Sequence, residues 1–231
     1  MITKFSCGLR ALALQPDFFA MDFSIHSRWH LRFRRLQASL PPSAVQTSYL
    51  DRLFQVGEWL FLFDLYESVS NSLCSGVRRL RPEEFDFLYP IFGTSIPYDR
   101  IRLHERAYIG PRQYGIAYVS FFTINSWGTL SPPTLVHEMV HVWQYVHRGA
   151  LYIPRALAGQ RTKMGYDYGG LPGLREATNL DSFNYEQMAT VIEDGFRLEN
   201  GYPLRFVRSG HAEARPYYAR FNAELRSACS P

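Results

Sequence analysis

The 231-residue chain has few cysteines and no long apolar run, and each deficit excludes a class of protein. The cysteines are odd in number, far apart and without a CxxC spacing: Cys7, Cys74 and Cys229. This pattern argues against a disulfide framework and a cysteine zinc site, and it fits folding in a reducing compartment. The most apolar run, residues 53–65, contains Glu58 and Asp64 and is too short to span a bilayer, so we interpret it as a buried core helix.

The chain also lacks a strong charge of one sign and a clear signal peptide. Its 25 Lys and Arg against 21 Asp and Glu give a net charge of +4 and a pI of about 9.0, which is too mild to indicate nucleic-acid binding. A basic aromatic cluster at residues 26–36, HSRWHLRFRRL, is interpreted as a solvated arm. The N-terminus has no good small-residue cleavage site, so we expect a cytoplasmic protein, or one exported by an injection-type secretion system without a signal peptide.

Apolar and aromatic residues are abundant, at 46% and 16% of the chain. This is the composition of a folded globular protein, and the length suits one large domain. Pro41-Pro42 interrupts the chain, so we divide it into an N-terminal arm at residues 1–42 and a single domain at residues 43–231. The first part of that domain, about residues 43–92, is expected to be helical.

Periodicity and punctuation predict an α+β fold that is mostly helical. Helices are expected where apolar residues recur at three- and four-residue steps between capping signals: from Ser43, at 82–92, from Ser131 to near Gly149, at about 183–199 and at 211–228. Two runs rich in β-branched and aromatic residues, 101–109 and 114–124, are expected to form an antiparallel pair of strands. Residues 150–182, rich in Gly, Pro, Tyr and Arg, are expected to be irregular.

Residues 137–147, HEMVHVWQYVH, lie on the helix expected after Ser131 and contain an HExxH motif. Positions i and i+4 of a helix lie on one face, so His137 and His141 can bind one metal ion. Neutral imidazoles suit Zn²⁺, and a catalytic zinc site takes three protein ligands and leaves a fourth position open. Such an ion polarises a carbonyl and lowers the pKa of water, and Glu138 is placed to take that water's proton. The alternative is two histidines that are hydrogen-bonded in a core.

The third ligand can come from two places. A compact HExxHxxGxxH site would use His147, but it needs a sharp turn at a glycine, and this chain has Gln144 there. Positive φ costs a residue with a Cβ about 1 kcal/mol or more. If the helix continues instead, His147 lies about 600° around it from His141 and faces another way. We therefore expect His147 at the helix C-terminus, near the negative end of the helix dipole.

Alternatively, the third ligand is a carboxylate or a histidine on a separate element. Seven residues further along the chain are candidates: Asp167, Glu176, Asp181, Glu186, Glu193, Asp194 and His211. Glu186 lies in the helix expected at 183–199, and the small Ala189 would allow close approach to a neighbouring helix. An ordinary exposed glutamate is the alternative at this position. Glu193 and Asp194 could orient a ligand histidine, although solvent exposure is the favoured interpretation for Glu193.

Five stretches within about residues 80–200 carry a family resemblance: FGTSIPYDRIRLHE (92–105), AYVSFFTIN (117–125), TLVHEMVHVWQYVHRG (134–149), YDY (166–168) and YEQMATVIEDGF (185–196). They resemble the zincin-like metallopeptidase domains that accompany Vgr and Rhs proteins of bacterial type VI secretion and related contractile injection systems. The resemblance implies a gluzincin-type site, with Zn²⁺ bound by His137, His141 and Glu186, and with Glu138 as general base. It also implies a zincin-like fold, in which a small antiparallel sheet packs on the active-site helix and a second helix carries the last ligand. Met188 departs from the family pattern, where glutamine is expected.

The leading hypothesis is a zinc-dependent metallopeptidase that acts on a protein or peptide substrate, as an effector or processing enzyme tied to a secretion apparatus. For the group that stabilises the oxyanion, Tyr168 is favoured over Tyr166, Tyr185 and His211. The alternative function is a non-catalytic binding or assembly module of the apparatus, with a structural metal or none. Expected partners are a component of the apparatus and an immunity or chaperone protein. Nucleic-acid binding through residues 26–36 is a third, weaker hypothesis.

Overall fold

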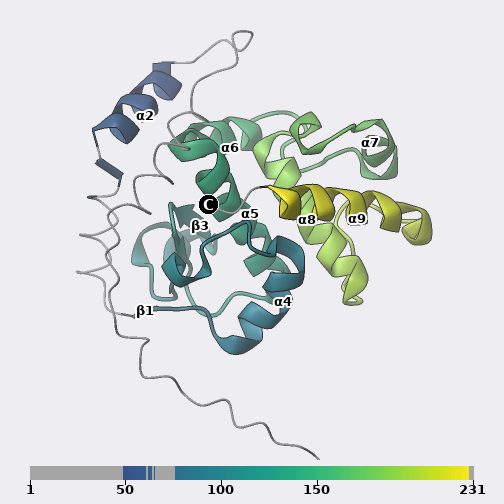
Figure 1. Ribbon diagram of the computed structural model, residues 1–231, viewed down its shortest axis with the longest axis horizontal. Coiled ribbons are helices and arrows are strands. Elements are labelled where there is room, and N and C mark those ends of the chain that lie inside the picture. The colour runs from purple at the N-terminus through teal and green to yellow at the C-terminus, as the bar shows by residue number, and fades with distance from the viewer. Residues whose placement is uncertain (1–48, 61, 64, 66–75, 229–231) are drawn as a thin grey trace, which may run out of the picture.

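The computed structural model describes residues 49–60, 62–63, 65 and 76–228 of the chain (Figure 1). The N-terminal arm predicted at 1–42, the basic cluster within it and the three cysteines lie outside these residues. Within the described part, no helix is both long and apolar enough to cross a bilayer.

Helices dominate the described residues and a small sheet accompanies them, which confirms the predicted α+β class. The helices predicted at 82–92, after Ser131, near 183–199 and near 211–228 all form within two residues of the expected ends. The helix bounds are α2 Tyr49–Trp59, α4 Pro82–Phe92, α5 Pro132–Arg148, α6 Tyr152–Gln160, α7 Gly170–Glu176, α8 Tyr185–Glu199 and α9 His211–Ser227.

The expectation of irregular structure at residues 150–182 is wrong, because this stretch contains α6 and α7. Proline and glycine lower the helix propensity of both segments, and close packing overrides that propensity. A Cβ at Gly159 would lie 3.1 Å from the Asn184 side chain, and a Cβ at Gly173 would lie 1.8 Å from the carbonyl oxygen of Tyr168. These glycines are therefore needed for close approach, which composition alone does not distinguish from a loop.

The sheet has four short strands in the order β1-β2-β4-β3. Their bounds are β1 Val77–Arg78, β2 Arg102–His104, β3 Tyr118–Ser120 and β4 Thr123–Asn125. β1 pairs antiparallel with β2, and β3 pairs antiparallel with β4, whereas β2 and β4 are parallel. The sheet is thus mixed, and the predicted antiparallel sheet is wrong. The cause is a hairpin in the run at 114–124, which reverses the chain and places β4 rather than β3 beside β2.

The turn between β3 and β4 contains no glycine. Phe121 itself takes a positive φ of 61°, a conformation that costs a residue with a Cβ about 1–2 kcal/mol. Burial offsets this cost, because the ring is 4% exposed and its centroid lies 5.1 Å from that of Tyr145. The hydroxyl of Tyr152 accepts a hydrogen bond from the Phe121 amide at 3.2 Å and donates one to the Val119 carbonyl at 2.8 Å. These bonds hold the turn against α6.

Helix α2 is not the buried core helix expected from residues 53–65. Its apolar residues Leu53 and Trp59 are more than half exposed, whereas the acidic Asp51 and Glu58 are buried. The helix contacts the 3₁₀ turn at Gly149–Leu151 and lies at the periphery of the molecule (Figure 1). An apolar run favours a helix, but it does not specify which side of that helix meets the rest of the protein.

Helix α5 lies at the centre of the fold. It contacts the sheet through β3 and packs along α8, and this is the most extensive contact between two elements of the described chain. α8 also packs against α9, and α9 contacts α4 (Figure 1). Val136 and Val140 on α5 and Ile192 on α8 are fully buried. The side chains between α5 and α8 are therefore held by the core on both sides.

Candidate metal centre

The sequence of α5 determines where its two histidines point. The Ser131 side chain accepts a hydrogen bond from the Thr134 amide, and prolines fill the first two helical positions. Gly149, with a φ of 69°, ends the helix. His137 and His141 then lie one turn apart on the side that faces α8, and each is 7% exposed.

The first turn of α8 supplies the third group. The side-chain oxygen of Asn184 accepts from the amides of Glu186 and Gln187 at 2.9 Å each, and Gln187 accepts from the Asn184 amide in return. Glu186 is therefore held in a capped turn, and it is 1% exposed. This burial excludes the alternative of an ordinary surface glutamate.

The structure brings His137, His141 and Glu186 together, with one possible ligand atom of each within 4.8 Å of the others. Oε2 of Glu186 lies 3.4 Å from Nε2 of His137 and 3.5 Å from Nε2 of His141. Ligands bound about 2.1 Å from a tetrahedral zinc ion are about 3.4 Å apart. The two nitrogens and one oxygen therefore fit the donor set of a zinc site, and the distances of the two nitrogens from Glu186 fit its size.

A fully buried amide orients His141. Gln144 donates from Nε2 to the carbonyl of Tyr185 at 2.9 Å, which places its Oε1 2.9 Å from Nδ1 of His141. Because an amide oxygen only accepts, Nδ1 of His141 carries the hydrogen, so in the neutral imidazole Nε2 has the lone pair and lies beside Glu186. Gln144 stands where the compact motif has glycine, and here it orients a candidate ligand and ties α5 to α8.

A buried carboxylate orients His137, as Gln144 orients His141. Oε2 of Glu193 lies 3.1 Å from Nδ1 of His137, and the guanidinium groups of Arg197 and Arg205 bind this carboxylate at 2.8 and 3.1 Å. The interpretation of Glu193 as a solvent-exposed acid is wrong, because the residue is 2% exposed. Seven residues make about two helical turns, so Glu186 and Glu193 share the side of α8 that faces α5.

The carboxylates attract positive charge to the centre. Burial alone would lower the pKa of His137, but its bonds with Glu186 and Glu193 outweigh this effect and raise that pKa to about 10. Burial would raise the pKa of Glu193, yet His137 and Arg197 hold it at about 2. Burial would also raise the pKa of Glu186, and the two imidazoles hold it far below its ordinary value. The carboxylates thus make the centre electrostatically favourable for positive charge at neutral pH.

Glu138 lies beside the centre and makes no hydrogen bond with another described residue. It is 6% exposed. Burial raises the pKa of its carboxyl group, and positive charge on His137 and His141 opposes the rise. A carboxylate with a raised pKa and no competing hydrogen bond is suited to take a proton from a reacting molecule.

The structure does not bring Tyr168, the predicted oxyanion group, into the metal centre. Its hydroxyl donates to Asp194 at 2.6 Å and lies 2.6 Å from the hydroxyl of Tyr218, which therefore donates to it. Asp194 also accepts from the backbone amides of Arg205 and Phe206. This buried network joins α8 and α9 to the segment between them. The position of Tyr168 thus favours a structural role.

Tyr166 is the tyrosine that the structure places beside the centre. Its ring lies 5.9 Å from that of His137, and the guanidinium of Arg205 lies over it at 5.4 Å. Burial, together with the negative charges of Glu186 and Glu138, raises its pKa to about 12. The hydroxyl makes no hydrogen bond with another described residue, so at neutral pH it remains a protonated donor.

The remaining candidates lie elsewhere. His147, in the last turn of α5, is hydrogen-bonded through Nε2 to the carbonyl of Ser95 at 2.7 Å, which confirms that it faces away from the centre. His211 is bonded through Nε2 to the carbonyl of Val207 at 3.2 Å. Three acidic candidates are not part of the described cluster: Asp167, Glu176 and Asp181.

Two amides at the centre are not predicted from the sequence. A signal for Gln144 exists, because positions i and i+3 of a helix are neighbours and Gln144 follows His141 by three residues. Gln160, at the end of α6, donates from Nε2 to Oε1 of Glu186 at 2.8 Å. No sequence signal points to Gln160, since its position depends on how α6 packs against α8.

No protein-family model, no curated protein and no solved structure matches this chain. The family resemblance of the sequence therefore stays a prediction. The candidate centre stands on its geometry, which is two histidines on one helix, a glutamate on another, and a separate hydrogen-bond partner for each imidazole.

Proposed function

We propose that the protein is a zinc-dependent metallopeptidase. The observation that carries this proposal is the buried group of His137, His141 and Glu186, in which Nδ1 of each imidazole has its own partner. This arrangement leaves both Nε2 atoms and one carboxylate oxygen to bind an ion, and three protein ligands leave a coordination position for reactants.

The donor set favours zinc over the common hard cations. Calcium and magnesium prefer sites built from oxygen atoms, whereas two of the three donors here are imidazole nitrogens. The negative charges of Glu186, in the centre, and of Glu193, beside His137, further favour the binding of a cation. Zinc is therefore the proposed cofactor.

Bound zinc would polarise the carbonyl of a peptide bond and lower the pKa of a water molecule. The side chains of the chain complete the proposed hydrolysis. Glu138 takes a proton from the attacking water and passes it to the leaving amine. Tyr166 donates a hydrogen bond to the carbonyl oxygen as it becomes negative. Glu193 and Gln144 hold the two imidazoles in their orientations.

Zinc content tests the centre. Elemental analysis of the purified wild-type protein should find about one zinc ion per chain, and Glu186→Gln should lose most of it, because an amide is a much poorer zinc ligand than a carboxylate. His147→Gln is the matched control, since this histidine lies on the same helix but bonds Ser95. Zinc retained by Glu186→Gln, or lost by His147→Gln, would contradict the proposed ligands.

Cleavage of an unfolded protein tests the reaction. The zinc-loaded wild type should cleave fluorescently labelled casein, and Glu138→Gln should keep its zinc while losing about 10²–10⁴-fold in rate. Glu176→Gln is the control, because this exposed acid on α7 is not part of the centre. A wild-type protein that binds zinc but cleaves no casein would reject the peptidase.

The sequence resemblance extends the proposal to a secretion-linked effector or processing enzyme. The competing function is a non-catalytic binding or assembly module of the same apparatus. Glu138→Gln separates the two, because a module would keep its biological role without this carboxylate and a peptidase would not.

A further inference from the structure

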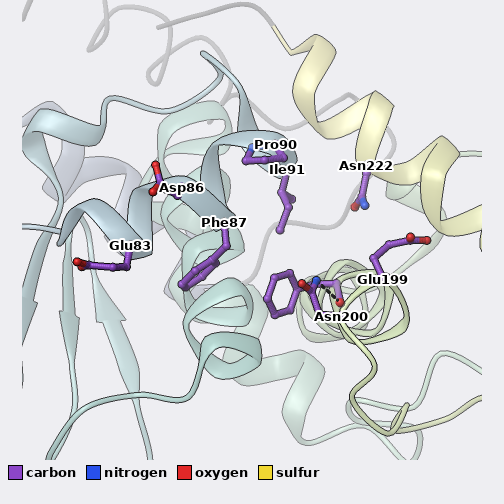
Figure 2. Close-up of a pocket in the computed structure, with 10 residues that line it drawn as sticks. Glu83, Asp86, Phe87, Pro90, Ile91, Glu199, Asn200 and Asn222 are labelled. Atoms are coloured by element: carbon purple, nitrogen blue, oxygen red, sulfur yellow. Dashed lines mark hydrogen bonds between the residues drawn. The ribbon is translucent and has the colours of Figure 1, made fainter. Parts of the chain in front are cut away.

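A groove of about 630 Å³ lies between α4, α8 and α9, and none of its lining residues belongs to the metal centre. Its floor is apolar and consists of Phe87 and Ile91 from α4 and Phe196 from α8. The rings of Phe87 and Phe196 are 5.5 Å apart. Figure 2 shows Ile91 and Asn222 directed into the space between the helices. The groove can therefore take the apolar part of a side chain from another molecule.

The polar groups around this floor are mostly hydrogen-bond acceptors. Glu83 and Asp86 are exposed carboxylates on α4, and neither has a partner among the described residues. Glu199, on α8, is paired with Arg215 at 2.8 Å. The side-chain oxygen of Asn222, on α9, is shielded from solvent and accepts no hydrogen bond within the described chain. A buried acceptor without a donor is unfavourable, and a bound donor would relieve it.

The backbone adds negative charge to the same place. Pro90, inside α4, has no amide hydrogen, so the carbonyl of Asp86 one turn earlier lacks its usual helical donor. α8 ends at Glu199, where the last carbonyls give a helix terminus about half a negative charge. The chain as a whole has a net charge of +4, so this groove is a local reversal of its sign.

We propose that the groove binds an arginine- or lysine-bearing segment of a partner protein. Such a side chain has a long apolar stem, which suits the floor, and a cationic end that only donates hydrogen bonds. A cationic group at the rim matches the carboxylates of Glu83 and Asp86, and a donor that enters between α4 and α9 would satisfy the Asn222 oxygen. A bare metal ion would not use the apolar floor, and an acidic segment would leave like charges together.

Fluorescence anisotropy with the full-length protein tests this proposal. The probe is a fluorescein-labelled octapeptide of alternating leucine and arginine, and EDTA in the buffer prevents any metal-dependent cleavage. We expect saturable binding that weakens as salt is added, and at least about tenfold weaker binding of the same peptide with glutamate in place of arginine. No binding to the wild type, or equal binding of both peptides, would overturn the proposal.

Variants locate the binding. The double variant Glu83→Gln with Asp86→Asn removes two unpaired carboxylates, and it should raise the Kd of the arginine peptide about fivefold. Glu176→Gln is the matched control, because Glu176 is also exposed and without a partner among the described residues but lies on α7. An equal rise in Kd with the control would mean general attraction to acidic surface and would overturn the groove as the site.

The experiments must also distinguish a partner protein from a second copy of the chain as the occupant of the groove. Sedimentation velocity should find the wild type and the double variant in the same monomeric state. A wild-type dimer that dissociates in the double variant would assign the groove to self-association and would overturn the partner-protein proposal.

Discussion

Replacing Gln144 by methionine tests whether a buried amide sets the affinity of the metal centre. Methionine has a similar length, and it removes the hydrogen bonds of the amide with Nδ1 of His141 and with the carbonyl of Tyr185, each 2.9 Å long. The His141 ring then loses the group that fixes its tautomer and orientation, and the first turn of α8 loses its tie to α5.

The expected magnitudes follow from these two bonds. Loss of the group that orients a ligand histidine lowers metal affinity by about 10–100-fold, which is about 1.4–2.7 kcal/mol. Gln144 is fully buried, so its replacement leaves the former partners of the amide inside the protein without that hydrogen bond. A buried polar group without a partner lowers the free energy of unfolding by about 1–3 kcal/mol. Gln144→Met should therefore bind zinc more weakly, and its zinc-free form should unfold at a lower urea concentration than the zinc-free wild type.

Three measurements separate orientation from packing. Competition with a chromophoric chelator gives zinc affinity, urea unfolding of the zinc-free protein gives stability, and the visible spectrum of the cobalt-substituted protein reports ligand geometry. Asn125→Leu is the matched control. Asn125 is a buried amide whose oxygen lies 3.3 Å from Nδ1 of His104 in the sheet. This control should lose stability and keep the zinc affinity and cobalt spectrum of the wild type. If Gln144→Met also keeps both, the amide only joins the helices and does not orient a ligand.

Three further outcomes are expected. Tyr166→Phe should keep its zinc and cleave casein roughly a hundredfold more slowly, and an unchanged rate would reject this hydroxyl as the oxyanion donor. Tyr168→Phe should keep zinc and activity but lower the free energy of unfolding by about 1–3 kcal/mol, because Asp194 stays buried without that donor; equal urea midpoints would contradict this. Arg78→Met should lower the free energy of unfolding by about 3 kcal/mol, because it leaves Glu84 buried without its cation. Burial would raise the pKa of Glu84, but hydrogen bonds from Arg78 hold it below its ordinary value of 4.5. The difference between wild type and variant should therefore be present at neutral pH and shrink as the pH falls below 4.5. A difference that is the same at every pH in urea unfolding would contradict this assignment.

Local signals predicted the helices well because capping acts within one turn. Pro82 and Ser131 mark the starts of α4 and α5, and Gly149 marks the end of α5, as the sequence predicts. The hairpin at Phe121 was not predictable in this way, because its positive φ is stabilised by burial of the ring and by Tyr152 rather than by a local preference for glycine. The parallel pairing of β2 and β4 follows from that turn.

The sequence by itself determined that His137 and His141 share one face of a helix and that Gln144 lets this helix continue past the motif. Both statements depend only on helical periodicity and on the cost of positive φ. Only the tertiary structure decided that Glu186 meets the two imidazoles and that Glu193 lies behind one of them. These contacts depend on how α5 and α8 pack along each other, and residues 45 or more positions apart in the chain carry no local signal of that packing.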